Sequence, residues 1–488
     1  MNSYTEYINN SLSSYSMLYP NKTDDVDKAF QYLIDKNTFR PFRKGLNDLF
    51  RRISLPDMST AEKCDYLVEK LHSIGSTVDK KTIVSWFSGA HRPNPGNGSR
   101  TLMYELCFAL NLSLDDIDWL AGHVWFSRSF NLHKWDEAVY FYCLKNGLSY
   151  ETAKRIIEEV RPILTSTDES LSATEADLPL CNTSHIEQKL EHIHSTDELI
   201  KFLIFNKTTF NTWNITAVSK IKGLHKMLMN KENESEKKAT HQLQDLLKDA
   251  TQKGNKTNYT YTKDFLPLIK QCGLLVQYRC KRAYSELGTG FAKELCSRSK
   301  SARKSGYTLF TKNLFSLTFL LEEFLSSDNG LLIKTYEERE LVKNAATDDN
   351  KTSEQLHIID TNFPDKKLLS SVLNSESIHT STAYDSIRKI LILLASHVYW
   401  YESYLTPNKY IKCDTQEKKI QVYTEVINVY LRECGYSELY SGNPYDWIFL
   451  VSSANANPPQ FFNELVKKLC KKMKRNWKAT VKKARKNT

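Results

Sequence analysis

The chain has 488 residues, a formal net charge of +10 and 41% hydrophobic residues. This composition is too apolar for a disordered chain, and its low content of Gly and Pro, 16 and 13 residues, argues against a turn-rich β architecture. The length allows roughly two to four domains. The recurrent three-to-four spacing of apolar residues predicts that these domains are all-α.

The positive charge is concentrated in one segment of the chain. Residues 466–488 contain eleven Lys and Arg and no acidic residue, so the rest of the chain is close to neutral. Leu465, Leu469, Met473 and Trp477 are four apart, which predicts a tail helix with an apolar edge and a basic coat. Such a helix suits the phosphates of a nucleic acid or an anionic membrane surface.

The cysteines and the apolar runs indicate the cellular setting. The ten Cys include no CxxC pair, which predicts free thiols and no compact zinc site. The N-terminus has no apolar signal segment, and the most apolar runs, Leu314–Leu325 and Ile390–Tyr401, are too short to cross a bilayer. We therefore expect a cytoplasmic protein without a membrane span, a bound metal or a cofactor.

In chain order, the first predicted elements are short amphipathic helices. Residues 1–36 are expected to form an N-terminal arm that contains one short helix. Residues 39–52 follow as a basic helix, and Ser59 can cap the helix after it. The apolar face of the basic helix is formed by Phe42, Leu46, Leu49 and Phe50.

The stretch over residues 76–120 has the clearest pattern in the chain. A short helix is predicted between Val78 and Gly89, with Asp79 as its N-cap and Gly89 just past its end. A second amphipathic helix follows it, and Ser113 can cap a third. The apolar face of the short helix is formed by residues at i, i+3 and i+4: Ile83, Trp86 and Phe87.

This order of parts resembles the helix-turn-helix family of phage repressors, the Cro and lambda-repressor-like proteins. The resemblance covers residues 39–122 and implies a DNA-binding domain over residues 37–123. The helix that holds Thr82 and Ile83 would be its recognition helix. The turn from residue 75 to residue 79 is longer than the tight turn of that family. The matching positions are Leu67, Val68, Leu71, Gly75, Val78, Thr82, Ile83, Trp86, Gly89, Pro93, Leu106, Ala109, Leu110, Leu112, Leu114 and Ile117.

The resemblance also implies site residues. The N-terminal residues of a recognition helix meet base edges, so Lys80, Lys81 and Ser85 are expected to read bases. Contacts to the DNA backbone are expected from three arginines: Arg43, Arg92 and Arg100. One positive face that joins Arg43, Lys80, Lys81 and Arg92 would favour DNA binding. An acidic or mixed face there would favour an interaction scaffold, in which this region is only a packing unit.

Further helical regions are predicted beyond this unit. Residues 124–164 are expected to form a helical extension whose aromatic side chains pack as core, and they resemble segments of uncharacterised proteins of Firmicutes. The remaining regions are expected to be a linker (165–184), a helical domain (185–330), a polar loop-rich segment (331–380), a C-terminal helical region (381–465) and the basic tail (466–488).

The sequence contains no HExxH, GxSxG or Walker motif, so we expect no enzymatic activity. The expected function is that of a bacterial transcriptional regulator that binds double-stranded DNA sequence-specifically. Its C-terminal region would form a homodimer or bind a protein partner or an effector. One alternative is a helical interaction scaffold of a mobile-element or defence system, in which the helix-turn-helix does not read DNA. A third hypothesis is an enzyme or toxin of such a system.

Overall fold

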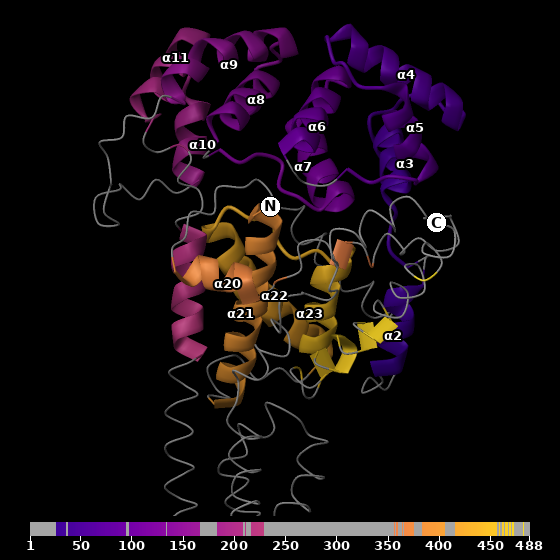
Figure 1. Cartoon of the computed structure of the whole chain (residues 1–488), viewed down its shortest axis with the longest axis vertical. Coiled ribbons are helices and arrows are strands. Elements are labelled where there is room, and N and C mark those ends of the chain that lie inside the picture. Colours follow the sequence, from indigo (N-terminus) through magenta and orange to yellow (C-terminus); the bar gives the residue numbers. More distant parts are fainter. Residues whose placement is uncertain are drawn as a thin grey trace, which may run out of the picture.

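The computed structural model of the chain is all-α (Figure 1). Among the residues that it describes, 76% are helical and none lies in a strand, which confirms the predicted fold class. None of the helices in these parts has the length and apolar character that a membrane span needs. The described residues are 26–35, 38–93, 97–132, 134–165, 183–207, 210, 216–228, parts of 356–374, 383–405, 415–455 and scattered positions from 458 to 482.

The N-terminal unit is a bundle of short α-helices that ends in a π-helix. Its elements are α3 (Phe42–Arg52), α4 (Thr60–Ser73), α5 (Lys80–Ser88), α6 (Asn97–Ala109), α7 (Leu114–Leu120) and η1 (Ala121–Trp125). α4 begins with a capping box, in which Ser59 and Glu62 each accept a hydrogen bond from the other's backbone amide. The α-helices share one apolar core, which includes Leu46, Leu67, Ile83, Leu106 and Ile117.

A second core joins helices from both sides of the predicted linker. These helices are α8 (Trp135–Lys145), α9 (Tyr150–Leu164), α10 (Thr183–Glu191) and α11 (Thr196–Phe205). Val139, Ile156, Leu190 and Leu203 are all buried in it. The aromatic residues of α8, such as Tyr140, are buried there too. The polar segment that was predicted as a linker therefore connects two pairs of helices that share one core.

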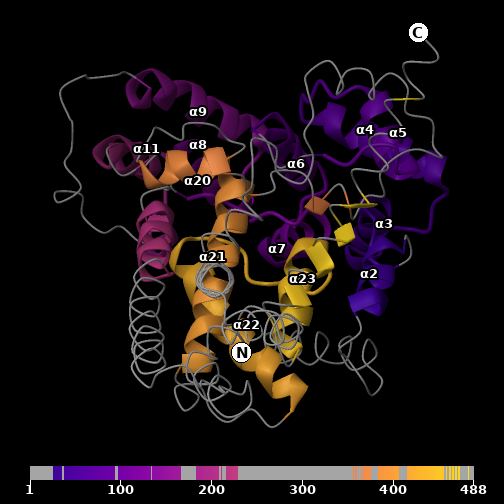
Figure 2. The same ribbon diagram turned by 60° about the horizontal axis from the view of Figure 1, so that its bottom comes forward.

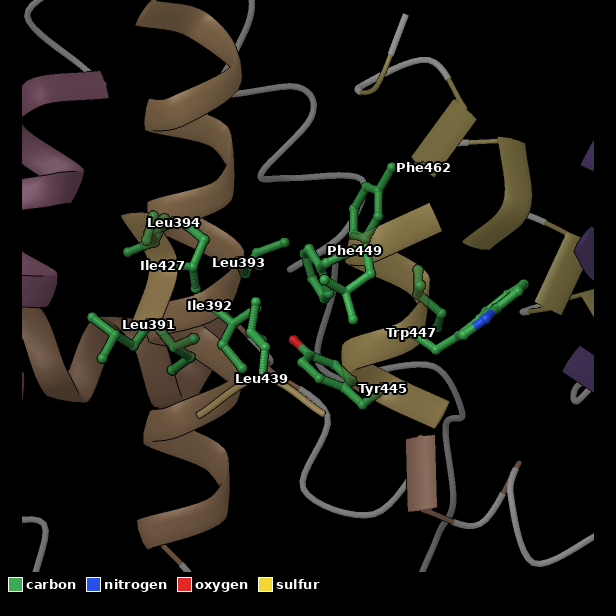
Figure 3. Close-up of a cluster of buried hydrophobic side chains, with 14 of the residues drawn as sticks. Leu391, Ile392, Leu393, Leu394, Ile427, Leu439, Tyr445, Trp447, Phe449 and Phe462 are labelled. Carbon is green, nitrogen blue, oxygen red and sulfur yellow. The ribbon is translucent and has the colours of Figure 1, made fainter. Parts of the chain in front are cut away.

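The third core belongs to the C-terminal part of the chain. Its main helices are α20 (Lys366–Leu373), α21 (Ala383–Leu405), α22 (Gln416–Glu433) and α23 (Pro444–Ala454), joined by a helix over residues 216–228. Figure 3 shows its centre, where aliphatic side chains of α21 lie beside Ile427 of α22 and aromatic side chains of α23. Most of residues 229–355, and with them much of two predicted regions, lie outside the described residues.

The N-terminal arm contributes a helix to this C-terminal core. Val26, Ala29 and Leu33 of α2 (Val26–Ile34) are buried in it, and the ring of Tyr32 stacks on that of Trp447 with centroids 4.9 Å apart. Figures 1 and 2 show α2 beside α23, although more than four hundred residues separate them in sequence. A helix near the N-terminal end of the described residues therefore packs in the same core as the C-terminal helices.

The tail begins as part of the same core. Leu465 and Leu469 are buried, and the ammonium of Lys468 pairs with Asp27 of α2. Met473 and Trp477, which were predicted to continue the apolar edge, lie outside the described residues. The first turn of the predicted tail helix is thus anchored to the body of the protein.

The C-terminal core meets the N-terminal unit at the segment around η1. The rings of His123 and Phe126 lie 4.5 Å and 6.1 Å from that of Tyr440, and the guanidinium of Arg128 donates to the carbonyl of Gly435 at 3.0 Å. Phe126 has φ +59°, an uncommon conformation for a bulky residue. The π-helix therefore ends in a sharp change of direction at this junction.

Candidate nucleic-acid interface

The segment that the sequence predicted as a helix-turn-helix consists of α4, a turn over residues 74–79, and α5. The chain leaves α4 through Gly75, whose φ of +79° suits a residue without Cβ. The amides of Gly75 and Ser76 donate to the carbonyls of His72 and Leu71 at 2.9 and 3.0 Å. This pair of bonds is a Schellman motif, which satisfies carbonyls at the helix end and turns the chain toward α5.

α5 has the caps and the buried face that its sequence predicted. The Asp79 carboxylate accepts a hydrogen bond from the amide of Lys81 at 2.9 Å, and Gly89 ends the helix with φ +76°. Ile83, Trp86 and Phe87 are buried in the core of the N-terminal unit. α5 lies with α4 at the edge of the molecule away from α21 and α22 (Figures 1 and 2).

The outer edge of α5 is exposed and carries residues of different chemistry. Its exposed residues are Lys80, Lys81, Val84 and Ser88. The predicted base reader Ser85 is half-buried, and its hydroxyl donates to the carbonyl of Thr82 at 2.6 Å. Val84 is 42% exposed and is one of five large hydrophobic residues that are exposed in the described part of the chain. The sequence pattern put Val84 and Ser88 off the apolar face, but nothing in it marked them as contact residues.

The two predicted lysines have different surroundings. The ammonium of Lys80 pairs with the carboxylate of Asp65 on α4, and this hydrogen bond and charge raise the pKa of Lys80. Lys81 is exposed at the next position, and its backbone amide donates a hydrogen bond to the N-cap residue, Asp79. An exposed ion pair adds little stability, so a competing anion can take the place of Asp65.

Arg43 is exposed on α3, close to the end of α5. Its Cδ lies 3.2 Å from the position that a Cβ would take at Gly89. Lys44 is exposed beside it. Arg43 therefore flanks the end of α5 from the neighbouring helix, and Lys44 adds a second exposed cation to α3.

The prediction that Arg100 contacts the DNA backbone is wrong. Arg100 is only 7% exposed, and its guanidinium binds both carboxylate oxygens of Glu137 at 2.9 and 2.6 Å. It also donates to the hydroxyls of Ser127 and Tyr104 at 2.9 and 2.7 Å. A charge with these buried partners cannot reach a phosphate without breaking the network.

Arg92 is half-buried, and its guanidinium is bonded within the protein, so its contact with a DNA backbone stays a prediction. One terminal nitrogen of its guanidinium donates to the carbonyls of Val124 and Trp125 at 2.9 and 2.8 Å, which satisfies the C-terminal end of η1. The guanidinium also lies over the ring of Phe126, 4.6 Å from its centroid. Arg92 thus links the segment after α5 to η1.

Glu137 is the charged centre of the buried network. Burial raises its pKa, but the charge and the hydrogen bonds of Arg100 outweigh burial and lower the pKa to about 2. The hydroxyl of Tyr104 and the backbone amide of Asn131 also donate to Glu137, at 2.5 and 2.7 Å. The pair holds α6 against α8.

The surface around α5 is mixed in charge. Glu62, Asp65 and Glu69 are exposed on α4, and Lys80 pairs with one of them. Among the described residues, no group of three or more His, Cys, Asp and Glu could hold a metal ion. Comparison of the chain with protein-family models, with curated proteins and with solved structures found no match.

Proposed function

We propose that the protein binds double-stranded DNA sequence-specifically, as a transcriptional regulator, with α5 as the helix that reads bases. The observation that carries the proposal is the exposed edge of α5, whose opposite face is fixed by Ile83, Trp86 and Phe87. A single helix held in this way fits the major groove of B-DNA, which is about 12 Å wide. α5 lies at the edge of the molecule in both views, away from α21 and α22 (Figures 1 and 2).

The exposed side chains of α5 match the chemistry of base edges. Lys80 and Lys81 can donate to the O6 and N7 acceptors of guanine. The methyl groups of Val84 can contact the methyl group of thymine. The hydroxyls of Ser85 and Ser88 both donate to carbonyls within the helix, so each can act only as an acceptor without giving up that bond. Ser85 is the weaker candidate of the two, because it is half-buried whereas Ser88 is exposed.

Phosphate contacts fall to the exposed cations of α3. Arg43 flanks the end of α5, and Lys44 is exposed at the next position of α3. Neither has a buried network of partners of the kind that holds Arg100. Cations at this position would fix the duplex against α5 and add affinity without reading sequence.

Selection from a random DNA pool tests the proposal. The full-length protein is incubated with random duplexes, and bound DNA is recovered and sequenced over several rounds. We expect enrichment of one motif, and we expect Lys81→Ala to weaken that enrichment more than Lys70→Ala, an exposed lysine on α4. Absence of any enriched motif from a folded protein would contradict the proposal.

The second candidate function is that of an interaction scaffold, and the mixed charge around α5 favours it. α4 packs against α5 and carries three exposed acidic residues. These carboxylates would repel the phosphates of a duplex. A mixed surface with one exposed valine suits a protein partner. The selection distinguishes the two, because a scaffold would enrich no DNA motif.

A further inference from the structure

One carboxylate connects the turn of the helix-turn-helix to two other helices. Glu105 of α6 accepts a hydrogen bond from the hydroxyl of Ser76 at 2.5 Å and another from the hydroxyl of Tyr150 at 2.9 Å. Ser76 lies in the turn between α4 and α5, and Tyr150 is the first residue of α9. Glu105 thus joins the turn to α9, whose residue Tyr150 is buried in the second core.

The turn has further contacts among the described residues. Ile74 packs against the second core and Val78 against the core of the N-terminal unit, and the Schellman motif fixes the backbone at Gly75 and Ser76. Ser76 is 6% exposed, and its Oγ also accepts from the amide of Val78 at 3.4 Å. The Ser76 side chain is therefore the point at which the turn is bonded to α6.

We propose that Glu105 is a positioning residue that fixes the orientation of α5 through Ser76, with Tyr150 fixing Glu105 in turn. The inference rests on the proposed function, because it assigns the network the task of aligning α5 with DNA.

The chemistry of the network suits a fixed support. A carboxylate that accepts from two hydroxyls makes charge-assisted hydrogen bonds, which are roughly twice as strong as neutral ones. Burial raises the pKa of Tyr150, and the adjoining charges and hydrogen bonds raise it further, so its hydroxyl keeps its proton at physiological pH. Tyr150 therefore still donates its hydrogen bond to Glu105 near neutral pH.

Hydrogen exchange combined with DNA binding tests this proposal on the full-length protein. Glu105→Gln removes the charge at nearly constant shape, Ser76→Ala removes only the turn's hydroxyl, and Glu151→Gln on the exposed side of α9 is the matched control. Amide exchange is measured by mass spectrometry on peptides from α3 and from residues 76–88. Affinity is measured for the DNA motif that the intact protein selects and for random duplex.

We expect exchange over residues 76–88 to accelerate roughly tenfold in Glu105→Gln and Ser76→Ala, the effect of losing a hydrogen bond to a charged group, with α3 unchanged. The ratio of affinities for motif and random DNA should fall by a similar factor, while affinity for random DNA stays constant. Exchange equal to that of the Glu151→Gln control in both variants overturns the proposal. Faster exchange in a protein that selects no DNA supports the positioning of α5 but overturns the proposed function.

Discussion

At the scale of single residues, position along a helix predicted which lysines are exposed but not which arginines are buried. Lys80 and Lys81 were expected off the apolar face of α5, and both are exposed. Arg100 has a buried partner, Glu137, 37 residues further along the chain. No local pattern encodes such a pairing, so its burial could not be predicted from sequence.

Arg100→Ala should destabilise the protein strongly. The variant leaves Glu137 buried without its main counter-charge, and breaking a buried ion pair from one side costs about 3–5 kcal/mol. Urea unfolding followed by tryptophan fluorescence measures the change. Arg43→Ala is the control, because an exposed substitution usually changes the free energy of unfolding by less than about 0.5 kcal/mol. Equal stability of the two variants would contradict the buried network.

At the scale of elements, capping residues and apolar spacing predicted α5 well. The helix was expected between Val78 and Gly89 and is observed over Lys80–Ser88, with Asp79 and Gly89 at its ends. The support of the turn by Glu105 could not be predicted. It depends on how α6 and α9 pack beside the turn, and spacing along one helix does not contain that information.

Trp86→Ala should unfold the N-terminal unit more readily than any change on the outer edge of α5. Trp86 is 1% exposed and meets the ring of Phe42 edge to face at 5.8 Å. Replacing a buried Trp by Ala costs roughly 3–5 kcal/mol, because its packing disappears and a cavity is left behind. Thermal unfolding by circular dichroism measures the shift, with Val84→Ala as control. Similar melting temperatures for the two variants would show that α5 is not held from its inner face.

At the scale of the whole molecule, the all-α class could be predicted, but the sharing of cores could not. α2 packs with α21–α23, and α10 and α11 pack with α8 and α9 across the polar segment. Composition shifts mark where a chain is polar, and they do not show whether the helices on either side return to the same core. Which helices share a core is therefore visible in the structure and not in the sequence.

Stability should fall as the pH drops from about 6.5 to 4. Burial lowers the pKa of both His123 and His397 to about 4, and for His123 the charges of Arg40 and Arg52 lower it further. The unfolded chain thus binds more protons in this range, so stability is present above pH 6.5 and is lost as the pH falls. His123→Phe should flatten the dependence of unfolding free energy on pH, measured by urea titrations at several pH values. An unchanged slope would contradict the buried state of this ring.

The basic tail should add affinity for DNA without adding specificity. Deletion of residues 473–488 removes seven Lys and Arg and keeps Leu469 in the core. The slope of log K against log salt becomes shallower by about 0.9 for each phosphate that the protein no longer neutralises. The salt dependence for random duplex should therefore weaken while motif preference stays the same. An unchanged slope would mean that the tail does not bind nucleic acid.

The base-reading role proposed for α5 is tested most directly by the ratio of the protein's affinities for selected and for random DNA. For Lys80→Ala/Lys81→Ala this ratio should fall at least tenfold, since a good base contact is worth roughly 1–3 kcal/mol. For Lys44→Ala both affinities should fall together, because phosphate contacts do not read sequence. A double variant that keeps the full ratio of the intact protein would contradict the claim that these lysines of α5 read DNA.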